Sequence, residues 1–308
     1  MSANSTINPL VIDKNNSLPL ERSQEAYPQG IIFPVDKPYR WTSSDVVRKI
    51  KYILRNHFDT KNVKIGHAGT LDPLATGLLL VCVGRACKLS EALQAEKKEY
   101  VAEFTLGATT PSFDREHPID SVYPVSHLSV EKMQEAVEAL KQQTLQMPPA
   151  YSAKYVNGTR SYYLARNGEE ALLQPAPIKI YAAELLYARC GTEVFDTHSP
   201  LLDEITRPSY GKDDLHNSFV VKKRIAAEDG KLVEHFMSDS LLPVSQIQNL
   251  PTAVVRIECS KGTYIRSMAR DFGDLLSCGA FMSALRRTAS GGFRVEQALD
   301  LKNYFDLL

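Results

Sequence analysis

GHAGTLDPLATG at residues 66–77 leads directly into the apolar run LLLVCV at residues 78–83. Three glycines allow backbone conformations and a close approach of ligand that other residues resist. Asp72 stands in the loop just before the predicted strand, where catalytic groups are often placed by a rigid scaffold. Asp72-Pro73 is equally typical of a helix start, with Asp as N-cap and Pro at the first helical position. Taken alone, this loop favours a cap or turn over a catalytic aspartate.

The segments around this loop predict an α+β fold. Before it, residues 31–35 predict a short strand, and Thr42-Ser43-Ser44-Asp45 predicts the cap of a helix with apolar positions Val46, Val47, Ile50, Ile53 and Leu54. After it, strands are expected at residues 78–83, 100–106, 178–190 and 252–260, and helices at 86–95, 129–142, 264–276 and 299–308. Because strands and helices do not strictly alternate, we expect a mixed, mainly antiparallel sheet flanked by helices.

Composition bounds the class of protein. The 308 residues contain 36 basic and 36 acidic side chains and 44% apolar residues, as in ordinary globular proteins. Basic residues concentrate between Arg48 and Lys64, opposed only by Asp59, which indicates either a basic face or a solvated helix surface. Five cysteines without a CxxC pair make a zinc site improbable and fit reduced thiols, so we expect a cytoplasmic protein.

The chain is expected to contain one main domain with two insertions. Residues 1–29 are polar and predict a flexible N-terminal tail, and residues 30–308 predict the main domain. Within it, residues 147–177 combine tyrosines with Lys and Arg and predict a projecting loop with one short helix near 160–166. Residues 191–250 are acidic and separate two strands, so they predict a partly ordered surface insertion into a hairpin.

Three further groups could carry chemistry. Tyr100 opens a strand, where packing in the sheet is its ordinary role. Arg266 falls in the first turn of a predicted helix, where the positive end of the dipole disfavours it, so either a carboxylate or phosphate partner or plain exposure would explain it. Tyr151 and Lys154 belong to an aromatic and basic pattern that suits bases and phosphates, although an ordinary loop is nearly as compatible.

The order of six separated motifs resembles the TruB-type tRNA pseudouridine synthases. The resemblance covers roughly residues 30–190 and 252–293. The motifs are DKP with TS (36–38, 42–43), GHAGTLDPLATG (66–77), KEY (98–100), YSAK with NG, R, Y and AR (151–166), KGTYIRS (261–267) and LRRT (285–288). The resemblance implies the pseudouridine synthase fold with a thumb-like RNA-binding segment at residues 147–177. It also implies isomerisation of uridine 55 in the T-loop of tRNA, by base flipping, aspartate-dependent cleavage of the glycosidic bond, rotation of the base and re-formation as a C-glycoside.

The resemblance assigns roles residue by residue. Asp72 matches the essential aspartate, Tyr100 the active-site tyrosine, and Arg266 the arginine that pairs with the aspartate and keeps it ionised. His67 matches a histidine that holds the T-loop with its base flipped out. The other expected substrate-binding residues are Tyr264, Leu285, Lys37, Lys98, Tyr151, Lys154 and Arg160. The resemblance implies no cofactor, no metal, no membrane and no obligate protein partner, and hence a monomer that binds tRNA.

Several features depart from the family pattern. Arg40 stands where the family usually has glycine, and Pro111 and Phe113 alter the surroundings of Asp114, which matches a family acidic position. The acidic insertion 191–250 is atypical, and no separate C-terminal RNA-binding domain is expected after Phe293. Two other functions remain: a non-catalytic RNA-binding module on the same scaffold, and a phosphate-binding enzyme using the glycine loop. The second lacks Gly-Lys-Ser/Thr after the loop, and intact Asp72, Tyr100 and Arg266 disfavour the first.

Overall fold

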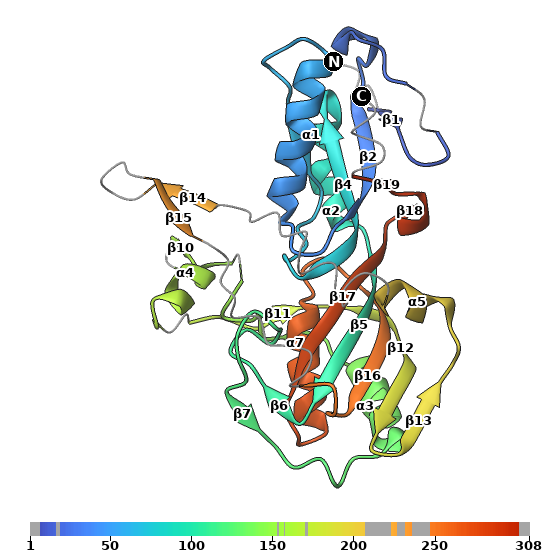
Figure 1. The fold of residues 1–308 in the computed structure, drawn as a ribbon, viewed down its shortest axis with the longest axis vertical. Coiled ribbons are helices and arrows are strands. Elements are labelled where there is room, and N and C mark those ends of the chain that lie inside the picture. Colours follow the sequence, from blue (N-terminus) through green and yellow to red (C-terminus); the bar gives the residue numbers. More distant parts are fainter. Residues whose placement is uncertain are drawn as a thin grey trace. The chain divides into compact units, whose positions relative to one another are not determined.

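The chain folds into two compact units. The computed structural model describes residues 7–16, 19–152, 154–156, 158–169, 172–206, 223–226, 232–235 and 247–301, and Figure 1 shows its elements. Unit 1 comprises Met1–Tyr100 and Arg286–Leu308, and unit 2 comprises Val101–Leu285. The boundary falls inside two strands, β5 (Lys98–Leu106) and β17 (Ala280–Ser290). The sequence predicts a single domain from residue 30, so this division is new.

Unit 1 is built on a mixed sheet. β2 (Ile31–Lys37) pairs antiparallel with β4 (Ala75–Val83), so that Ile31 lies opposite Val83. β3 (Ile65–His67) pairs antiparallel with β4, and β17 is the next strand beyond β4. β1 (Leu10–Val11) and β19 (Leu299–Asp300) pair parallel with β2, and β18 (Phe293–Arg294) pairs antiparallel with β17. Among the described residues of unit 1, 3-10 turns span Gln24–Ala26, Gly84–Leu89 and Val295–Gln297.

The core of unit 1 explains the continuous apolar run of β4. Successive side chains of a strand point to opposite faces, and here both faces are covered. Leu79 and Val81 pack with Val46, Ile50 and Leu54 of α1 (Ser43–His57), which lies along the sheet in Figure 1. Leu78, Leu80 and Cys82 pack on the other face with Ala86, Val295 and Ala298, and α2 (Ser90–Ala95) follows nearby in the chain. The predicted cap of α1 is confirmed as a capping box between Thr42 and Asp45.

Both ends of unit 1 correct the sequence predictions. Residues 1–29 were expected to form a flexible tail, but Leu10 and Val11 pair with β2, and Ile12 and Leu20 are buried in the α1 core. The apolar run of this segment, residues 10–12, is too short to give a periodic signal. A terminal helix was expected at 299–308, but Leu299 and Asp300 form β19. Residues 302–308 of that expected helix lie outside the described residues.

Unit 2 contains an antiparallel sheet with two main helices. Its strand order is β17, β5, β16 (Thr252–Cys259), β12 (Ile180–Cys190) and β13 (Glu193–Asp196). α3 (Val130–Leu140) buries Met133, Val137 and Leu140, as its spacing predicts, and α7 (Ile265–Leu275) begins after Tyr264. Two short strand pairs flank the sheet: β6 (Ala108–Thr109) with β7 (Ser121–Val122), and β8 (Leu145–Gln146) with β11 (Ala176–Pro177). The α+β class and the mainly antiparallel sheet are confirmed.

The two insertions differ in how they pack. In residues 147–177 the structure forms β9 (Tyr155–Val156), β10 (Thr159–Arg160) and α4 (Ser161–Arg166), which confirms the predicted short helix. The acidic insertion 191–250 is not wholly peripheral. β13 extends the sheet beside β12, and Ile205 of α5 (Pro200–Thr206) is buried with Leu186 and Val254. β14 (Lys223–Ala226) pairs with β15 (Leu232–His235), and most of the remaining insertion lies outside the described residues.

Candidate functional site

The glycine-rich loop turns the chain from β3 into β4. The backbone N–H of Ala75 donates to the carbonyl of Asp72 at 3.1 Å, which closes a turn at Asp72-Pro73. β4 begins at Ala75, so the turn interpretation is confirmed and the helix-start interpretation is wrong. Gly77 has φ +98°, and a Cβ there would meet the carbonyl oxygen of Arg287 at 2.3 Å. Only glycine therefore fits the point where the loop enters the sheet.

Two buried side chains hold the loop. The Arg287 guanidinium, 1% exposed, donates to the carbonyls of Leu78 at 2.6 Å, Gly69 at 3.1 Å and Thr70 at 3.5 Å. The Ser43 hydroxyl accepts from the N–H of Leu71 at 2.9 Å. Polar backbone groups of a buried loop need such partners. Sequence reasoning quoted Arg287 within its motif but gave it no role, although a charge inside a strand-like run was the available signal.

Lys37 lies beneath the same loop and is completely buried. Its Nζ donates to the carbonyls of Trp41 at 2.6 Å, Pro38 at 3.0 Å and Pro73 at 3.3 Å. Burial lowers the pKa of Lys37 from 10.5 to about 7, and the negative charge of Asp72 acts in the opposite direction. The amino group of Lys37 is turned inward onto the backbone next to Asp72, and its contact with substrate stays a prediction.

The start of β5 carries two predicted residues. Tyr100 is half-buried, which leaves part of its side chain accessible. Lys98 is buried, and its Nζ donates to the carbonyls of Gln94 and Glu96, both at 2.5 Å, at the C-terminal end of α2. A lysine there satisfies terminal carbonyls and complements the helix dipole. Lys98 therefore has a structural role at the end of α2, and its contact with substrate stays a prediction.

His67, in β3, is half-buried. Its Nδ1 has no hydrogen-bond partner among the described residues. Burial, and then the charge of Arg287, lower the pKa of His67. A lowered pKa favours the neutral imidazole at physiological pH, and a neutral ring can both accept a hydrogen bond and stack on a base.

In unit 2, Arg266 occupies the first turn of α7 and is 5% exposed. Its Nη2 donates to the carbonyl of Tyr151 at 2.9 Å, and Nη1 donates to the carbonyl of Ser112 at 3.2 Å. Nη1 also lies 3.6 Å from Oδ2 of the buried Asp114. A buried guanidinium beside a buried carboxylate offsets the helix-dipole cost of this position. The plain-exposure interpretation of Arg266 is thus wrong, since the arginine is enclosed by polar partners.

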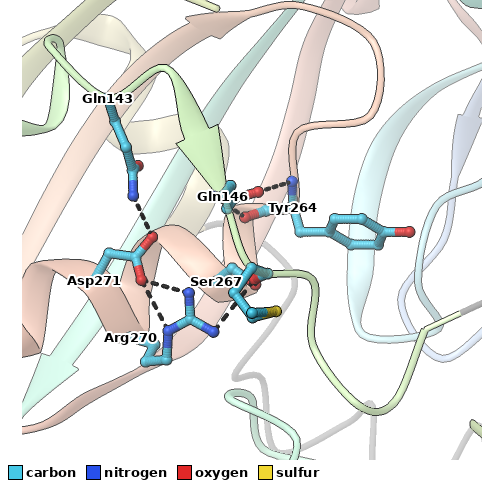
Figure 2. Close-up of polar contacts among 7 residues, drawn as sticks. Gln143, Gln146, Tyr264, Ser267, Arg270 and Asp271 are labelled. Carbon is cyan, nitrogen blue, oxygen red and sulfur yellow. Dashed lines mark hydrogen bonds and ion pairs between the residues drawn. The ribbon is translucent and has the colours of Figure 1, made fainter. Parts of the chain in front are cut away.

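A polar network joins the root of residues 147–177 to α7 (Figure 2). The Gln146 amide accepts from the N–H of Tyr264 at 2.8 Å and donates to its carbonyl at 3.1 Å, while the Tyr264 ring extends away from the amide. The Ser267 hydroxyl donates to the Met147 carbonyl at 2.9 Å. Arg270 pairs with Asp271, which also accepts from Gln143 at 2.6 Å. Sequence reasoning found no member of this network except Tyr264.

The remaining predicted residues also belong to unit 2. Leu285 is 7% exposed in β17. Tyr151 and Lys154 are half-buried, and Tyr151 stacks obliquely on His117, with ring centroids 4.6 Å apart. The Arg160 guanidinium lies 4.9 Å from the ring centroid of Tyr155, whose side chain is 65% exposed. Residues 147–177 therefore present an accessible aromatic and cationic surface, as their composition predicts.

The structure groups the predicted residues in two sets. Unit 1 contains one set, namely Asp72, Tyr100, His67, Lys37 and Lys98, and unit 2 contains Arg266, Tyr264, Leu285, Tyr151, Lys154 and Arg160. A hollow of about 520 Å³ in unit 2, lined by Gln143, Asp271 and Leu275 among others, includes none of them. Within the described part of the chain, no cluster of three or more His, Cys, Asp or Glu residues could hold a metal ion.

Comparison with known proteins identifies the family. A sequence model of the TruB family pseudouridylate synthase N-terminal domain matches residues 55–198. A protein of Phocaeicola vulgatus named tRNA pseudouridine synthase B is 36% identical over 278 residues, which cover 90% of this chain and 93% of that protein. The chain belongs to the TruB family of pseudouridylate synthases. The Thermus thermophilus protein named tRNA pseudouridine synthase B is also 36% identical, over 88% of this chain and 76% of that one.

As a TruB-family member, the chain is an isomerase. A second sequence model, of the tRNA pseudouridylate synthase B C-terminal domain, matches residues 266–306. The described residues of this match include nearly all of α7 and the whole of β17 and β18. These elements belong to units 1 and 2. The structure titled a Cbf5-Nop10-Gar1 complex aligns with 90% of this chain and 54% of that chain, with a TM-score of 0.52 and 24% identity. This likeness supports the fold. Across the described residues, no helix is both long and apolar enough to span a membrane.

Proposed function

We propose that this TruB-family enzyme converts uridine to pseudouridine in tRNA, and that its target is uridine 55 of the T-loop. The observation that carries the proposal is 36% identity over 93% of the length of a tRNA pseudouridine synthase B. The buried frame of Lys37, Ser43 and Arg287 around the loop of Asp72 supports it, because a catalytic group needs a fixed backbone.

The reaction places demands that these residues can meet. The target base is extruded from its stack, because its reacting atoms are inaccessible inside the folded loop. Asp72 then assists cleavage of the bond between N1 of uracil and C1′ of the ribose. The base rotates, its C5 bonds to C1′, and the proton displaced from C5 leaves while N1 gains one. Substrate and product have the same atoms, so the reaction consumes no oxidant or co-substrate.

The proposed roles of the other residues follow the family assignment. Arg266 pairs with Asp72 and holds it ionised, since an opposite charge favours the charged form of a carboxyl group. A guanidinium has five N–H donors and can serve several partners at once. Tyr100 packs on the base and helps to remove the final proton, while Tyr264 and Leu285 form the walls of the uracil pocket. Half-burial of Tyr100 and Tyr264 is compatible with these roles.

RNA is proposed to be held by His67 and by the thumb segment, residues 147–177. Tyr151, Lys154 and Arg160 belong to this segment, and the exposed ring of Tyr155 beside Arg160 adds a surface for a base or ribose. Neutral His67 would hold the T-loop through its ring. A monomeric state, a cytoplasmic location and independence of cofactors stay predictions.

Asp72→Asn tests the proposal, because it removes the carboxylate while keeping the shape of the side chain. Wild type and variant are incubated with an unmodified tRNA transcript, pseudouridine is mapped at each position, and tRNA binding is measured in parallel. We expect wild type to modify position 55 and the variant to bind tRNA normally without forming pseudouridine. Full activity of the variant would refute the role of Asp72. A wild type that binds tRNA but makes no pseudouridine would instead support the non-catalytic RNA-binding module.

A further inference from the structure

The outward face of α1 carries a row of cations around one aromatic ring. Arg48, Lys51, Tyr52 and Arg55 follow a spacing of three and four residues, which places them on one face of the helix. This face is opposite to Val46, Ile50 and Leu54, whose side chains are fully buried. Tyr52 is 69% exposed, so a large ring stands in water among positive charges. We call these four residues the α1 face.

The charges of this face are poorly compensated by the protein. Asp45, the one acidic residue of α1, is buried in the capping box and forms an ion pair with Arg48. Lys51 and Arg55 have no acidic partner anywhere in the described part of the chain. A merely solvated helix surface usually mixes both signs of charge. Here the exposed charges of α1 are all positive, and beyond the helix exposed Asp59 is followed by exposed Lys61 and Lys64.

The α1 face begins beside the catalytic loop. Ser43, at the first turn of α1, is hydrogen-bonded to Leu71, the neighbour of Asp72. With a rise of about 1.5 Å per residue, Arg48 lies about 8 Å and Arg55 about 18 Å along the helix from Ser43. The cations therefore lead away from the loop that carries Asp72, as far as about 18 Å from the first turn of the helix.

We propose that the α1 face binds the phosphate backbone of the substrate tRNA outside the T-arm. Lys51 and Arg55 contact phosphates, and the Tyr52 ring packs on a ribose or an unpaired base between them. The proposal rests on the proposed function for the identity of the RNA. An anionic membrane fits this face less well, because interfacial helices present a broad apolar face to lipid, whereas the apolar face of α1 is buried in the protein core.

The test compares Lys51→Glu/Arg55→Glu with wild type on two RNAs, a full-length tRNA transcript and the isolated T-arm hairpin. The matched control is Lys14→Glu/Lys132→Glu, which makes the same charge change at two exposed sites off this face. We expect kcat/KM of the α1 variant to fall at least fivefold more on tRNA than on the hairpin, while the control keeps the wild-type ratio. Equal losses on both RNAs, or an equal effect of the control, would overturn the proposal.

Binding measurements separate this surface from the proposed function. Each phosphate contact contributes a salt slope of about −0.7 to −0.9, so wild type should lose about tenfold more tRNA affinity than the variant between about 50 and about 200 mM salt. Equal salt slopes for wild type and variant would overturn the proposal and would favour an acidic protein as the partner of the α1 face. These slopes are informative even if no pseudouridine forms, an outcome that would refute the catalytic proposal alone. The neutral variant Lys51→Gln/Arg55→Gln should also weaken the salt dependence of tRNA affinity, by a smaller amount than the glutamate variant.

Discussion

Lys37→Met is expected to make unfolding less dependent on pH between about pH 6 and about pH 9. Lys37 is buried, and its pKa in the folded protein is about 7, against 10.5 for the ordinary side chain. Between these two values the unfolded chain binds more protons than the folded one, so the free energy of unfolding rises with pH. Lys37 therefore destabilises the fold most at low pH, and the penalty is relieved as pH rises through about 7 towards 10.5.

The two pKa values fix the size of the effect. Proton linkage with them gives a penalty of roughly 5 kcal/mol at about pH 6 and roughly 2 kcal/mol at about pH 9. The difference between wild type and Lys37→Met should accordingly shift by about 2–3 kcal/mol in favour of wild type over this range. The sign at any one pH also depends on the carbonyls of Trp41 and Pro73, which the methionine leaves without their donor.

Denaturant unfolding at several pH values measures this shift. Trp41 is the one tryptophan of the chain and its carbonyl accepts from Lys37, so its fluorescence reports directly on this region. Lys14→Met, at an exposed position of the same unit, controls for the loss of one positive charge. A difference between wild type and Lys37→Met that stays constant from about pH 6 to about pH 9 would refute a buried lysine with a lowered pKa.

Three other substitutions test separate parts of the structure. Gln146→Glu keeps an acceptor for the N–H of Tyr264 but loses the donor to its carbonyl, so kcat/KM should fall about tenfold with little change in secondary structure by circular dichroism. Ile205→Ala should lower the free energy of unfolding by about 2–5 kcal/mol, whereas Leu172→Ala, at an exposed site, should change it little; equal effects would mean that α5 is peripheral. Gly77→Ala should cost about 3 kcal/mol or more, measured by denaturant unfolding, because its φ is positive and its Cβ would strike Arg287; near-wild-type stability would contradict that geometry.

Elements with strong local signals were predictable from the sequence. Thr42 and Asp45 form a capping box with each other, and the apolar stripe of α1 needs only a sheet beneath it. The strand at 78–83 was also predictable, because its continuous apolar run is a strong local signal. The buried parts of residues 1–29 and 191–250 were missed, because Ile12 ends an apolar run of only three residues and Ile205 follows only the pair Leu201-Leu202, and both short groups stand in polar surroundings. Their burial depends on partners far away in the chain.

β17 shows why a buried strand can escape sequence analysis. It contains Arg286 and Arg287 in succession, a pattern that argues against burial. In the fold, Arg286 forms a forked ion pair with Asp36, at 2.8 and 3.0 Å, and Arg287 satisfies carbonyls of the glycine loop. The conformation of Arg40 was also not predictable from its residue type. Its φ of +65° favours glycine, the residue that the family usually has there.

In the candidate site, the motifs identified the residues but not the direction in which their side chains point. Motif order pointed to Lys37 and Lys98 as substrate contacts, yet both direct their ammonium groups onto backbone carbonyls inside the protein. A motif records that a residue type recurs at a position, and a frame around a catalytic loop produces such recurrence as readily as contact with substrate. Lys37, Ser43 and Arg287 come from three distant segments and all bond to the backbone on either side of Asp72. The DKP, TS and LRRT motifs thus each contribute a side chain that holds the backbone of one turn, and this is a structural reason for these residue types at these positions.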